Sequence, residues 1–552
     1  MKRLWEYLKP YKRLAILAPI LMLLEVGAEL ALPKLMTFMI NQGVGTRNTA
    51  IITKTGIEML VIAIIGIIGG IGCLICATLV SQRTGTDLRR AAFGKIQEFS
   101  FHNIDTFSTP SLITRLTNDI TQIQLVIMIC LRMLVRSPLL CVGSIIMAFS
   151  INAKIAGMFL IVVVLLAIAV YLILRVAIPK FKLVQEKLDK VNTVMRECLA
   201  GIRVVKAFVR HDYEVEKFNE VNQDYKETTV SAFRMMLLMS PVMMILVNGT
   251  IVGILWFGGL QTQAGSMRVE EIMACITYLM QMMMAAMLLA MNFMFISRAK
   301  ISTDRLEEIL DTVVDIADPK EPKQPARAEG RVEYRHVSYR YKLGSGDPVL
   351  DDISFTAEPG QTVGILGETG SGKSTLVNLL PRLYDVTDGQ ILVDGIDVRD
   401  YAIHDLRKRV AVVLQETILF SGTIRENIKW GKPDATDEEI IAAAKAAQAH
   451  DFIMELPNQY DTELGQRGVN VSGGQKQRIS IARALIQNPN IIIFDDSTSA
   501  VDSLTEKRIR QAMKTSHSGC TKFIIAQRIS SVRDADKILV LGGGKIVAEG
   551  NH

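Results

Sequence analysis

The sequence predicts two unlike parts, a polytopic α-helical membrane domain with six transmembrane helices and, after it, a soluble α/β domain. Three runs of residues, 59–80, 155–174 and 272–297, contain no charged side chain. A helix needs about 20 mostly apolar residues to span a bilayer. Beyond residue 330, short apolar stretches alternate with charged ones, which is typical of the buried strands and helices of a soluble domain.

The composition excludes two broad classes of protein. Hydrophobic residues make up 49% of the 552-residue chain and charged residues 21%, which excludes an intrinsically disordered chain. The 62 basic and 56 acidic side chains are evenly interleaved, so we predict no nucleic-acid binding from the net charge of +6. Cys73 and Cys76 have the spacing of a metal site but no second pair, so we interpret them as packing residues.

Six membrane spans are expected within a membrane domain of residues 1–317. We place them near residues 14–40, 57–80, 121–150, 155–178, 233–260 and 270–298. Basic side chains gather before the first span, after the second and after the fourth, which puts those ends in the cytosol. The chain therefore returns to the cytosol after the sixth span. It then passes through a Pro- and charge-rich linker at 318–329 and enters the soluble domain at 330–552.

The two connections on the cytosolic side are too long for structureless loops. They contain few Gly or Pro residues, and the second has periodic apolar positions. Structureless loops longer than about 15 residues are uncommon. We therefore expect the transmembrane helices to continue far into the cytosol. Each pair should turn around through a short transverse segment, near residues 109–116 in the first connection and near 197–208 in the second.

Two acidic side chains lie inside the first predicted span. Glu25 and Glu29 are four residues apart and therefore share one face of a helix. Charges inside a bilayer are costly and usually face a cavity or a partner. The pair is either an acidic patch for a cationic substrate, or it is neutralised by an Arg or Lys of a neighbouring helix or placed in a wet vestibule. Arg132 and Arg136 repeat the spacing nearer the inner leaflet, where snorkelling or helix pairing explains them.

Methionine is abundant, and half of the 26 Met residues cluster in the last two spans. Flexible, polarizable side chains adapt to different apolar ligands. Met287 and Met291 are therefore candidate substrate contacts, together with Glu25 and Glu29. Packing against lipid or filling gaps between helices is the alternative explanation for the methionines.

A phosphate-binding loop determines the chemistry of the soluble domain. The apolar strand 361–366 is followed by a loop that satisfies G-x-x-x-x-G-K-[ST] and then by a helix. Backbone N–H groups of such a loop converge on phosphate, Lys373 can reach the β- and γ-phosphates, and Ser374 can ligate Mg²⁺. Asp495, after the buried strand 491–494, is placed to hold the Mg²⁺ through water. The candidate nucleotide-binding residues of the loop are Gly367, Thr369, Gly370, Ser371, Gly372, Lys373, Ser374 and Thr375. These features predict an α/β P-loop ATPase domain.

The pentapeptide Val-Ser-Gly-Gly-Gln at 471–475 resembles the signature sequence of ABC ATPases. Tyr341 matches the family's aromatic residue that stacks on adenine, and Gln415 matches its Q-loop. Residues 499–502, which end in Asp502, match its D-loop. With six spans before this domain, the whole chain resembles a half-transporter of the ABC exporter family, which has the type IV exporter fold.

The resemblance implies how a complete transporter is assembled. Two ATPase domains meet head to tail, and each ATP lies between the phosphate loop of one domain and the signature of the other. Mg²⁺ would be held by Ser374, by Gln415 and, through water, by Asp495. The signature contacts of this chain would be Ser472, Gly474 and Gln475. The two transverse segments would be the coupling helices that connect ATP binding to the membrane helices.

Two departures from the family pattern change the expected chemistry. The usual catalytic Glu after the Mg²⁺-holding Asp is replaced by Asp496, and the usual switch His is replaced by Gln527. The shorter carboxylate is displaced by about 1 Å, which can lower a rate about 100-fold, and Gln cannot carry charge. The pattern resembles the degenerate-site subunit of bacterial heterodimeric multidrug exporters. A homodimer that hydrolyses ATP weakly with Asp496 is the alternative.

The resemblance implies a bacterial plasma-membrane protein that uses ATP and Mg²⁺ to export amphipathic drugs or lipids by alternating access. Its partner would be a second half-transporter with Glu and His at its own catalytic positions. Membrane lipids would surround the assembled pair. Other possibilities are a peptide or natural-product exporter, half of a siderophore importer, a homodimeric lipid flippase and an ATP-binding regulatory half. The family usually continues for a few helical turns beyond His552, so the sequence is expected to end short of the complete domain.

Overall fold

The computed structural model describes residues 2–341, 348–497 and 501–551, without a few side chains of the last long membrane helix. The chain divides into two compact units. Met1–Lys95 and Pro110–Asp311 form one, called here the membrane unit. Ile96–Thr109 and Thr312–His552 form the other, called here the soluble unit. A short segment between two membrane helices therefore belongs to the same unit as the phosphate-binding loop.

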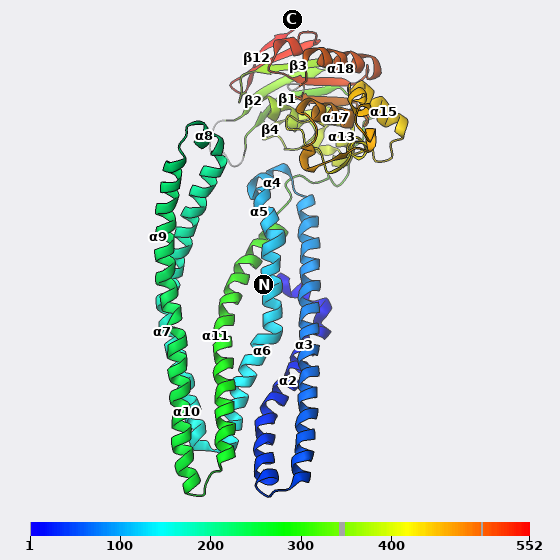
Figure 1. Ribbon diagram of the computed structural model, residues 1–552. Coiled ribbons are helices and arrows are strands. Elements are labelled where there is room, and N and C mark those ends of the chain that lie inside the picture. Colours follow the sequence, from blue (N-terminus) through cyan, green and yellow to red (C-terminus); the bar gives the residue numbers. More distant parts are fainter. Residues whose placement is uncertain (1, 342–347, 498–500, 552) are drawn as a thin grey trace. The chain divides into compact units, whose positions relative to one another are not determined.

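Long helices make up the membrane unit, and six helical stretches of the described residues are long and apolar enough to cross a membrane, which confirms the prediction of six spans. Figure 1 shows α7 and α9 side by side, joined by the short helix α8. The helices and their bounds are α1 (Lys2–Leu8), α2 (Lys12–Phe38), α3 (Thr49–Gln97), α6 (Ile120–Ile151), α7 (Ala153–Ala200), α8 (Ile202–Ala207), α9 (His211–Leu237), α10 (Met239–Gln263) and α11 (Val269–Asp311).

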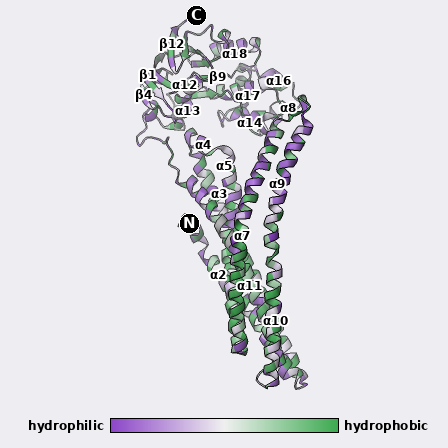
Figure 2. Ribbon diagram, turned by 90° about the vertical axis from the view of Figure 1, so that its left-hand side faces the viewer, coloured by the Kyte–Doolittle hydropathy of each residue, from purple (hydrophilic) through white to green (hydrophobic). Residues whose placement is uncertain are grey.

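Several of these helices are longer than their apolar portions. In Figure 2, α10 is largely hydrophobic, whereas the parts of α7 and α9 beside α8 are largely hydrophilic. The helix α7 continues unbroken for 48 residues from a start capped by Asn152, whose side chain accepts hydrogen bonds from the N–H groups of Lys154 and Ile155. Such a cap satisfies backbone donors that a helix start leaves without partners. The second transverse segment, expected at 197–208, contains α8.

The first transverse helix lies earlier than predicted. It is α4 (Phe101–Phe107), which starts at a capping box formed by Ser100 and Asn103. The predicted segment, 109–116, instead begins the next helix, α5 (Thr109–Thr114), which continues through a π-helical turn into α6. Proline is tolerated in the first turn of a helix, so Pro110 starts α5 rather than marking the turn.

Small residues bring α3 close to α2. A Cβ atom added at Gly66 would lie 2.9 Å from the Cβ of Ala28, and one added at Gly69 would lie 2.8 Å from the carbonyl oxygen of Leu21. Small residues allow membrane helices to approach in this way. Cys73 and Cys76 are buried in the core that α2, α3 and α6 share.

Two larger sheets and a two-stranded ribbon organise the soluble unit. The six-stranded sheet has the order β12-β11-β3-β10-β9-β6, the four-stranded sheet β2-β1-β4-β5, and β7 pairs with β8. The strands are β1 (Val332–Tyr339), β2 (Leu350–Ala357), β3 (Thr362–Gly367), β4 (Asp388–Val393), β5 (Ile396–Asp397), β6 (Val410–Val413), β7 (Gly422–Thr423), β8 (Glu463–Leu464), β9 (Ile491–Asp495), β10 (Thr521–Ile525), β11 (Lys537–Gly542) and β12 (Lys545–Gly550).

Helices surround the strands of the soluble unit. They are α12 (Lys373–Leu379), α13 (Ile403–Arg409), α14 (Ile424–Lys429), α15 (Asp437–Ala446), α16 (His450–Met454), α17 (Gly473–Leu485) and α18 (Ser503–Ser516). The strands β11, β3, β10, β9 and β6 run parallel. Their buried side chains, such as Val363, Ile493 and Phe523, form near-continuous apolar runs, as expected for a parallel sheet covered on both faces. The carboxyl ends of these strands therefore meet at one edge, where ligands bind in open α/β sheets.

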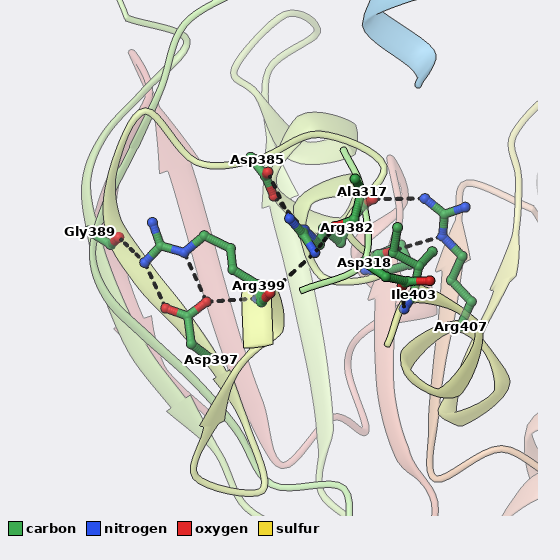
Figure 3. A network of polar contacts seen from close by, with 10 residues as sticks. Ala317, Asp318, Arg382, Asp385, Gly389, Asp397, Arg399, Ile403 and Arg407 are labelled. Atoms are coloured by element: carbon green, nitrogen blue, oxygen red, sulfur yellow. Dashed lines mark hydrogen bonds and ion pairs between the residues drawn. The ribbon is translucent and has the colours of Figure 1, made fainter. Parts of the chain in front are cut away.

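The segment that follows the last membrane helix is held by the soluble unit. Residues 312–331 contain no helix or strand. The buried guanidinium of Arg382 donates to the carbonyl oxygen of Ala317 at 3.3 Å and pairs with Asp385 at 2.8 Å. The carboxylate of Asp318 accepts from the N–H of Ile403 at 2.7 Å (Figure 3). The start of the expected linker, 318–329, is thus fixed to the surface of the soluble unit.

Candidate functional site

The phosphate-binding loop has the backbone shape that its glycines allow. Gly367, Gly370 and Gly372 have φ of 155°, 86° and 95°, a region that L side chains rarely adopt. A Cβ at Gly367 would lie 2.4 Å from the carbonyl oxygen of Leu541, whereas one at Gly370 would have nothing within 4 Å. The loop is therefore closely packed at its start and open at Gly370, where a ligand can approach.

Two side chains of the loop are suited to a phosphate group. The hydroxyl of Ser371 is buried and has no hydrogen-bond partner among the described residues, which is rare for a buried polar atom. The ammonium group of Lys373 donates to the carbonyl oxygens of Gly367 and Glu368, at 2.9 and 2.7 Å. An anion in the loop would supply a partner for Ser371 and a stronger acceptor for Lys373.

The residues predicted to hold Mg²⁺ lie together. The hydroxyl of Ser374 donates to the carboxylate of Asp495 at 2.9 Å, and Asp495 is only 4% exposed. Hydroxyl and carboxylate oxygens are the ligands that Mg²⁺ prefers, so this pair fits the ion. A cavity of about 270 Å³ joins them to the loop. Its lining includes the predicted residues Thr369, Gly370, Gly372, Lys373, Ser374, Thr375, Gln415, Asp495, Asp496 and Gln527.

Burial controls the ionisation of the two neighbouring carboxylates. It raises the pKa of Asp495 above its usual value of 3.8, with a smaller contribution from the Asp496 charge. It also raises the pKa of Asp496, while a hydrogen bond from Gln527 opposes this effect. The site therefore brings together two carboxylates whose charge is unfavourable, and a bound divalent cation would stabilise their charged forms.

Asp496 and Gln527 contact each other directly. The side-chain amide of Gln527 donates to the Oδ2 atom of Asp496 at 2.8 Å. Asp496 adopts φ of 45°, a left-handed conformation that Asp tolerates better than most residues. Its position directly after β9 places this carboxylate at the cavity wall, where it is held by an uncharged amide.

The predicted signature residues form the start of α17, a helix of 13 residues. The hydroxyl of Ser472 accepts from the N–H of Gln475, and the Gln475 amide oxygen accepts from the N–H of Ser472 at 2.8 Å. Gly474 lies in the first turn and adds no side chain in front of the helix start. A helix N-terminus attracts anions. None of these signature residues lines the described part of the phosphate cavity, so the structure does not bring the two predicted halves of an ATP site together in one chain.

The D-loop is described only at its end. Asp502 caps α18 by accepting from the N–H of Thr505 at 2.9 Å, and these hydrogen bonds lower the pKa of its carboxyl. Ser499 and Ala500 lie outside the described residues.

Comparisons with known proteins agree on the family. The ABC transporter transmembrane region matches residues 15–286, and the ABC transporter family matches residues 350–499. The chain is 42% identical over its whole length, and over 96% of the relative's length, to the uncharacterized ABC transporter ATP-binding protein YfiB of Bacillus subtilis. The chain belongs to the ABC transporters. It is a fused half-transporter whose ATP hydrolysis is coupled to transport, and a multi-pass protein of the inner membrane.

Other relatives of this ABC transporter are described by function. This chain is 37% identical to a fatty acid ABC transporter ATP-binding/permease protein of Mycobacterium bovis, over 86% of this chain and 74% of the relative. It is 35% identical to an ATP-dependent lipid A-core flippase of Syntrophus aciditrophicus, over 87% and 79%. A bacterial Atm1-family ABC exporter with ATP bound has the same fold, with a TM-score of 0.80, 26% identity and coverage of 98% and 95%.

An aromatic cluster beside the phosphate loop of the transporter includes a residue that sequence reasoning missed. The ring of Tyr341 lies 4.9 Å from that of Tyr339 and 5.6 Å from that of Tyr384, and its hydroxyl is 3.2 Å from that of Thr375. Tyr384 also contacts α4, because its hydroxyl donates to Asp105 at 2.9 Å. Its ring lies 6.0 Å from that of Phe101 on the same helix. Within the soluble unit, Tyr384 thus connects the predicted adenine side chain to the first transverse helix. No motif marks Tyr384 in the sequence.

We expect Tyr384→Ala to raise the Kd for ATP about two- to tenfold, because an aromatic pair is worth about 0.5–1.5 kcal/mol beyond its buried area. It should also lower transport per ATP hydrolysed, because α4 loses its hydrogen-bond and ring contacts. Titration with a fluorescent ATP analogue measures the first effect, and reconstituted transport measures the second. Tyr384→Phe is the control, since it keeps the ring and removes only the hydrogen bond to Asp105. An equal Kd in wild type and Tyr384→Ala would contradict the support of Tyr341 by this ring.

In the membrane unit, an arginine of a neighbouring helix pairs with the two half-buried acids. The guanidinium of Arg136 on α6 lies 2.8 Å from the carboxylate of Glu29 and 3.7 Å from that of Glu25. Of the alternatives that the sequence leaves open for Glu25 and Glu29, this contact corresponds to pairing with an arginine of a neighbouring helix. Met287 is half-buried on α11, and the side chain of Met291 lies outside the described residues.

Asp495→Asn is expected to raise the Tm of the nucleotide-free protein at pH 7. Because burial raises the pKa of Asp495 in the folded state, the folded chain binds more protons than the unfolded chain at pH values just above 3.8, and stability falls as the pH rises through that window. The variant removes this penalty and can still accept from Ser374. Calorimetry from pH 7 down to pH 4 should show a Tm difference that shrinks as the pH falls towards the unfolded value, with exposed Glu463→Gln as an unchanged control. A lower Tm for Asp495→Asn at pH 7 would contradict the sign.

Proposed function

We propose that this half-transporter exports amphipathic compounds, drugs or lipids, as one half of a heterodimer, and that its own ATP site hydrolyses slowly. The observation that carries the proposal is the hydrogen bond from Gln527 to Asp496 at 2.8 Å. It engages the carboxylate that would have to activate water, and it supplies no charge at the position of the family's switch His. The signature at the start of α17 is complete, so it can serve a second chain.

The chain's own residues would act mainly by positioning. The loop N–H groups and Lys373 hold the phosphates, and Tyr341 stacks on the base. Mg²⁺ would be held by Ser374, Gln415 and, through water, Asp495, and would neutralise charge on the β- and γ-phosphates. ATP bound between two domains favours their closed arrangement, and this difference in affinity switches the membrane helices from inward-open to outward-open. A slowly hydrolysed ATP would keep the two domains partly associated through the cycle.

The substrate class is proposed from the apolar membrane unit and from the relatives. One relative is described as a fatty acid transporter and another as a lipid A-core flippase. Fatty acids and lipid A are both amphiphiles. Transport into inside-out vesicles of a fluorescent amphiphile tests the direction. Accumulation that requires ATP supports export, and ATP-dependent release would instead indicate an importer.

The state of the purified protein tests the pairing. The chain expressed alone should hydrolyse ATP about 100-fold more slowly than an ordinary exporter, as expected for a displaced base. Co-expression with a half-transporter that has Glu and His at the corresponding positions should restore the rate. Full turnover by the chain alone, at a rate set by Asp496, would contradict the heterodimer and indicate a homodimeric lipid flippase. The homodimeric lipid flippase is the second candidate function, because Asp496 still places a carboxylate at the cavity wall.

A further inference from the structure

Charges of both signs meet inside the membrane unit, and they do not fully satisfy one another. Arg136 pairs with Glu29 and, at 3.7 Å, with one oxygen of Glu25. The other oxygen of Glu25, Oε2, is buried without a hydrogen-bond partner. One turn away from Arg136 on α6, the Nε atom of Arg132 is also buried without one. A buried polar group without a partner is costly, and more so when it is charged.

Both side chains with unpartnered atoms line the same cavity. It has a volume of about 430 Å³ and lies between α2, α3 and α6, with Glu25, Glu29 and Arg132 in its wall. Pockets that hold small molecules have volumes of about 300–1,000 Å³. The cavity wall thus carries a carboxylate and a guanidinium, each with one atom that has no hydrogen-bond partner among the described residues.

Glycine residues of α3 make room for the carboxylate. A Cβ at Gly70 would lie 2.9 Å from the Oε2 atom of Glu25, the atom without a partner. Gly66 lies one turn away in the same wall. A larger residue at Gly70 would displace the carboxylate, so Gly70 allows Glu25 its position at the cavity.

The apolar part of the wall continues onto the outer surface of α3. Ile67 and Ile71 line the cavity and are 59% and 55% exposed. In a transmembrane helix, such side chains face lipid chains. A ligand with a charged head and apolar tails can therefore place its head among the charged residues while its tails stay beside α3.

We propose that this cavity binds the zwitterionic head group of an amphiphile, with an ammonium group at Glu25 and an anionic group at Arg132. Charge complementarity selects this occupant, because a cation alone leaves Arg132 unsatisfied and an anion alone leaves Glu25 unsatisfied. The proposal rests on the export of amphiphiles proposed above and names their head-group chemistry.

Binding of a short-chain phosphatidylethanolamine with a fluorescent acyl chain tests the site in the full-length transporter in nanodiscs. Unlabelled phosphatidylethanolamine should compete at least about tenfold better than phosphatidylglycerol, which has no ammonium group, or a long-chain primary amine, which has no phosphate, as expected for the loss of one charge-assisted hydrogen bond. Free phosphoethanolamine should compete poorly because it has no tails. Equal competition by all of the lipids, or tight binding of free phosphoethanolamine, would overturn the proposal.

Three variants test which charged side chain of the cavity binds which group of the lipid head. Arg132→Gln should abolish the advantage of phosphatidylethanolamine over the long-chain primary amine, and Glu25→Gln its advantage over phosphatidylglycerol. Gly70→Ala keeps every charge but displaces Glu25, and should resemble Glu25→Gln. The controls are Glu58→Gln and Arg268→Gln, whose side chains are exposed. Unchanged binding in the three cavity variants would overturn the site, even if amphiphile export is found. Intact binding without ATP-driven flux would instead contradict only the proposed function.

Discussion

Gly474→Asp in this chain is expected to lower the ATPase rate of the assembled heterodimer about 100- to 1,000-fold, the loss seen when one stabilising donor of a transition state is removed. Gly474 lies in the first turn of α17, where the proposed pair places the γ-phosphate of the partner's ATP. A carboxylate there repels the phosphate and occupies its space. Lys373→Ala in the same chain should lower the rate only a few-fold, because the ATP that it holds contributes little turnover. Steady-state phosphate release measures both rates.

The controls for this pair of variants separate catalysis from folding. Gly519→Asp introduces the same side chain at an exposed glycine of the soluble unit where an added Cβ meets nothing within 4 Å, and should leave the rate unchanged. Binding of a fluorescent ATP analogue shows that the phosphate loop of each variant is folded. Equal losses for Gly474→Asp and Lys373→Ala would mean that the two sites hydrolyse ATP equally, against the proposed asymmetry.

Asp496→Glu combined with Gln527→His is expected to raise turnover at this chain's own site about 100-fold, the factor that a 1 Å misplacement of a reacting group removes. The added methylene extends the carboxylate, and the hydrogen bond that now holds it at 2.8 Å is lost with Gln527. Glu is less favourable than Asp at φ of 45°, but that penalty is about 1 kcal/mol, which is smaller than the expected gain.

This gain must be measured where only one site can react. The partner's catalytic Glu is therefore replaced by Gln, and single-turnover hydrolysis of ATP is followed in the assembled pair. Asp496→Asn with Gln527→His is the matched control and should stay slow, since it changes the switch position without supplying a base. Unchanged turnover in Asp496→Glu with Gln527→His would remove the catalytic explanation of both substitutions.

The parts of the site that the sequence predicts are those encoded by neighbouring residues. The phosphate loop needs its glycines and Lys373 within one stretch, and the strands on either side make its context recognisable. Gln415, Asp495 and Gln527 lie at or just beyond the ends of three different strands, yet they line one cavity with the loop because parallel strands end at the same edge of the sheet.

The parts that were missed depend on contacts between distant residues. Tyr384 meets Asp105 across 279 positions of the chain, and nothing local marks either residue. The sequence does not identify the side chain that pairs with Glu25 and Glu29, because the register between α2 and α6 decides which arginine reaches them. The first transverse helix, α4, begins earlier than the predicted segment 109–116, because the capping box formed by Ser100 and Asn103 starts it, and that box depends on side-chain geometry.

The hydroxyl of Ser472 can both accept and donate a hydrogen bond, and within the described part of the chain it is used as an acceptor. Its oxygen accepts from the N–H of Gln475, which fixes the rotamer before any second chain arrives. Its hydrogen stays free to donate, because a hydroxyl is both an acceptor and a donor. In the proposed pair, docking onto the partner's nucleotide therefore sacrifices little side-chain freedom at this residue. In the proposed pair, this preorganised hydroxyl would therefore bind the phosphate more tightly than a mobile serine would.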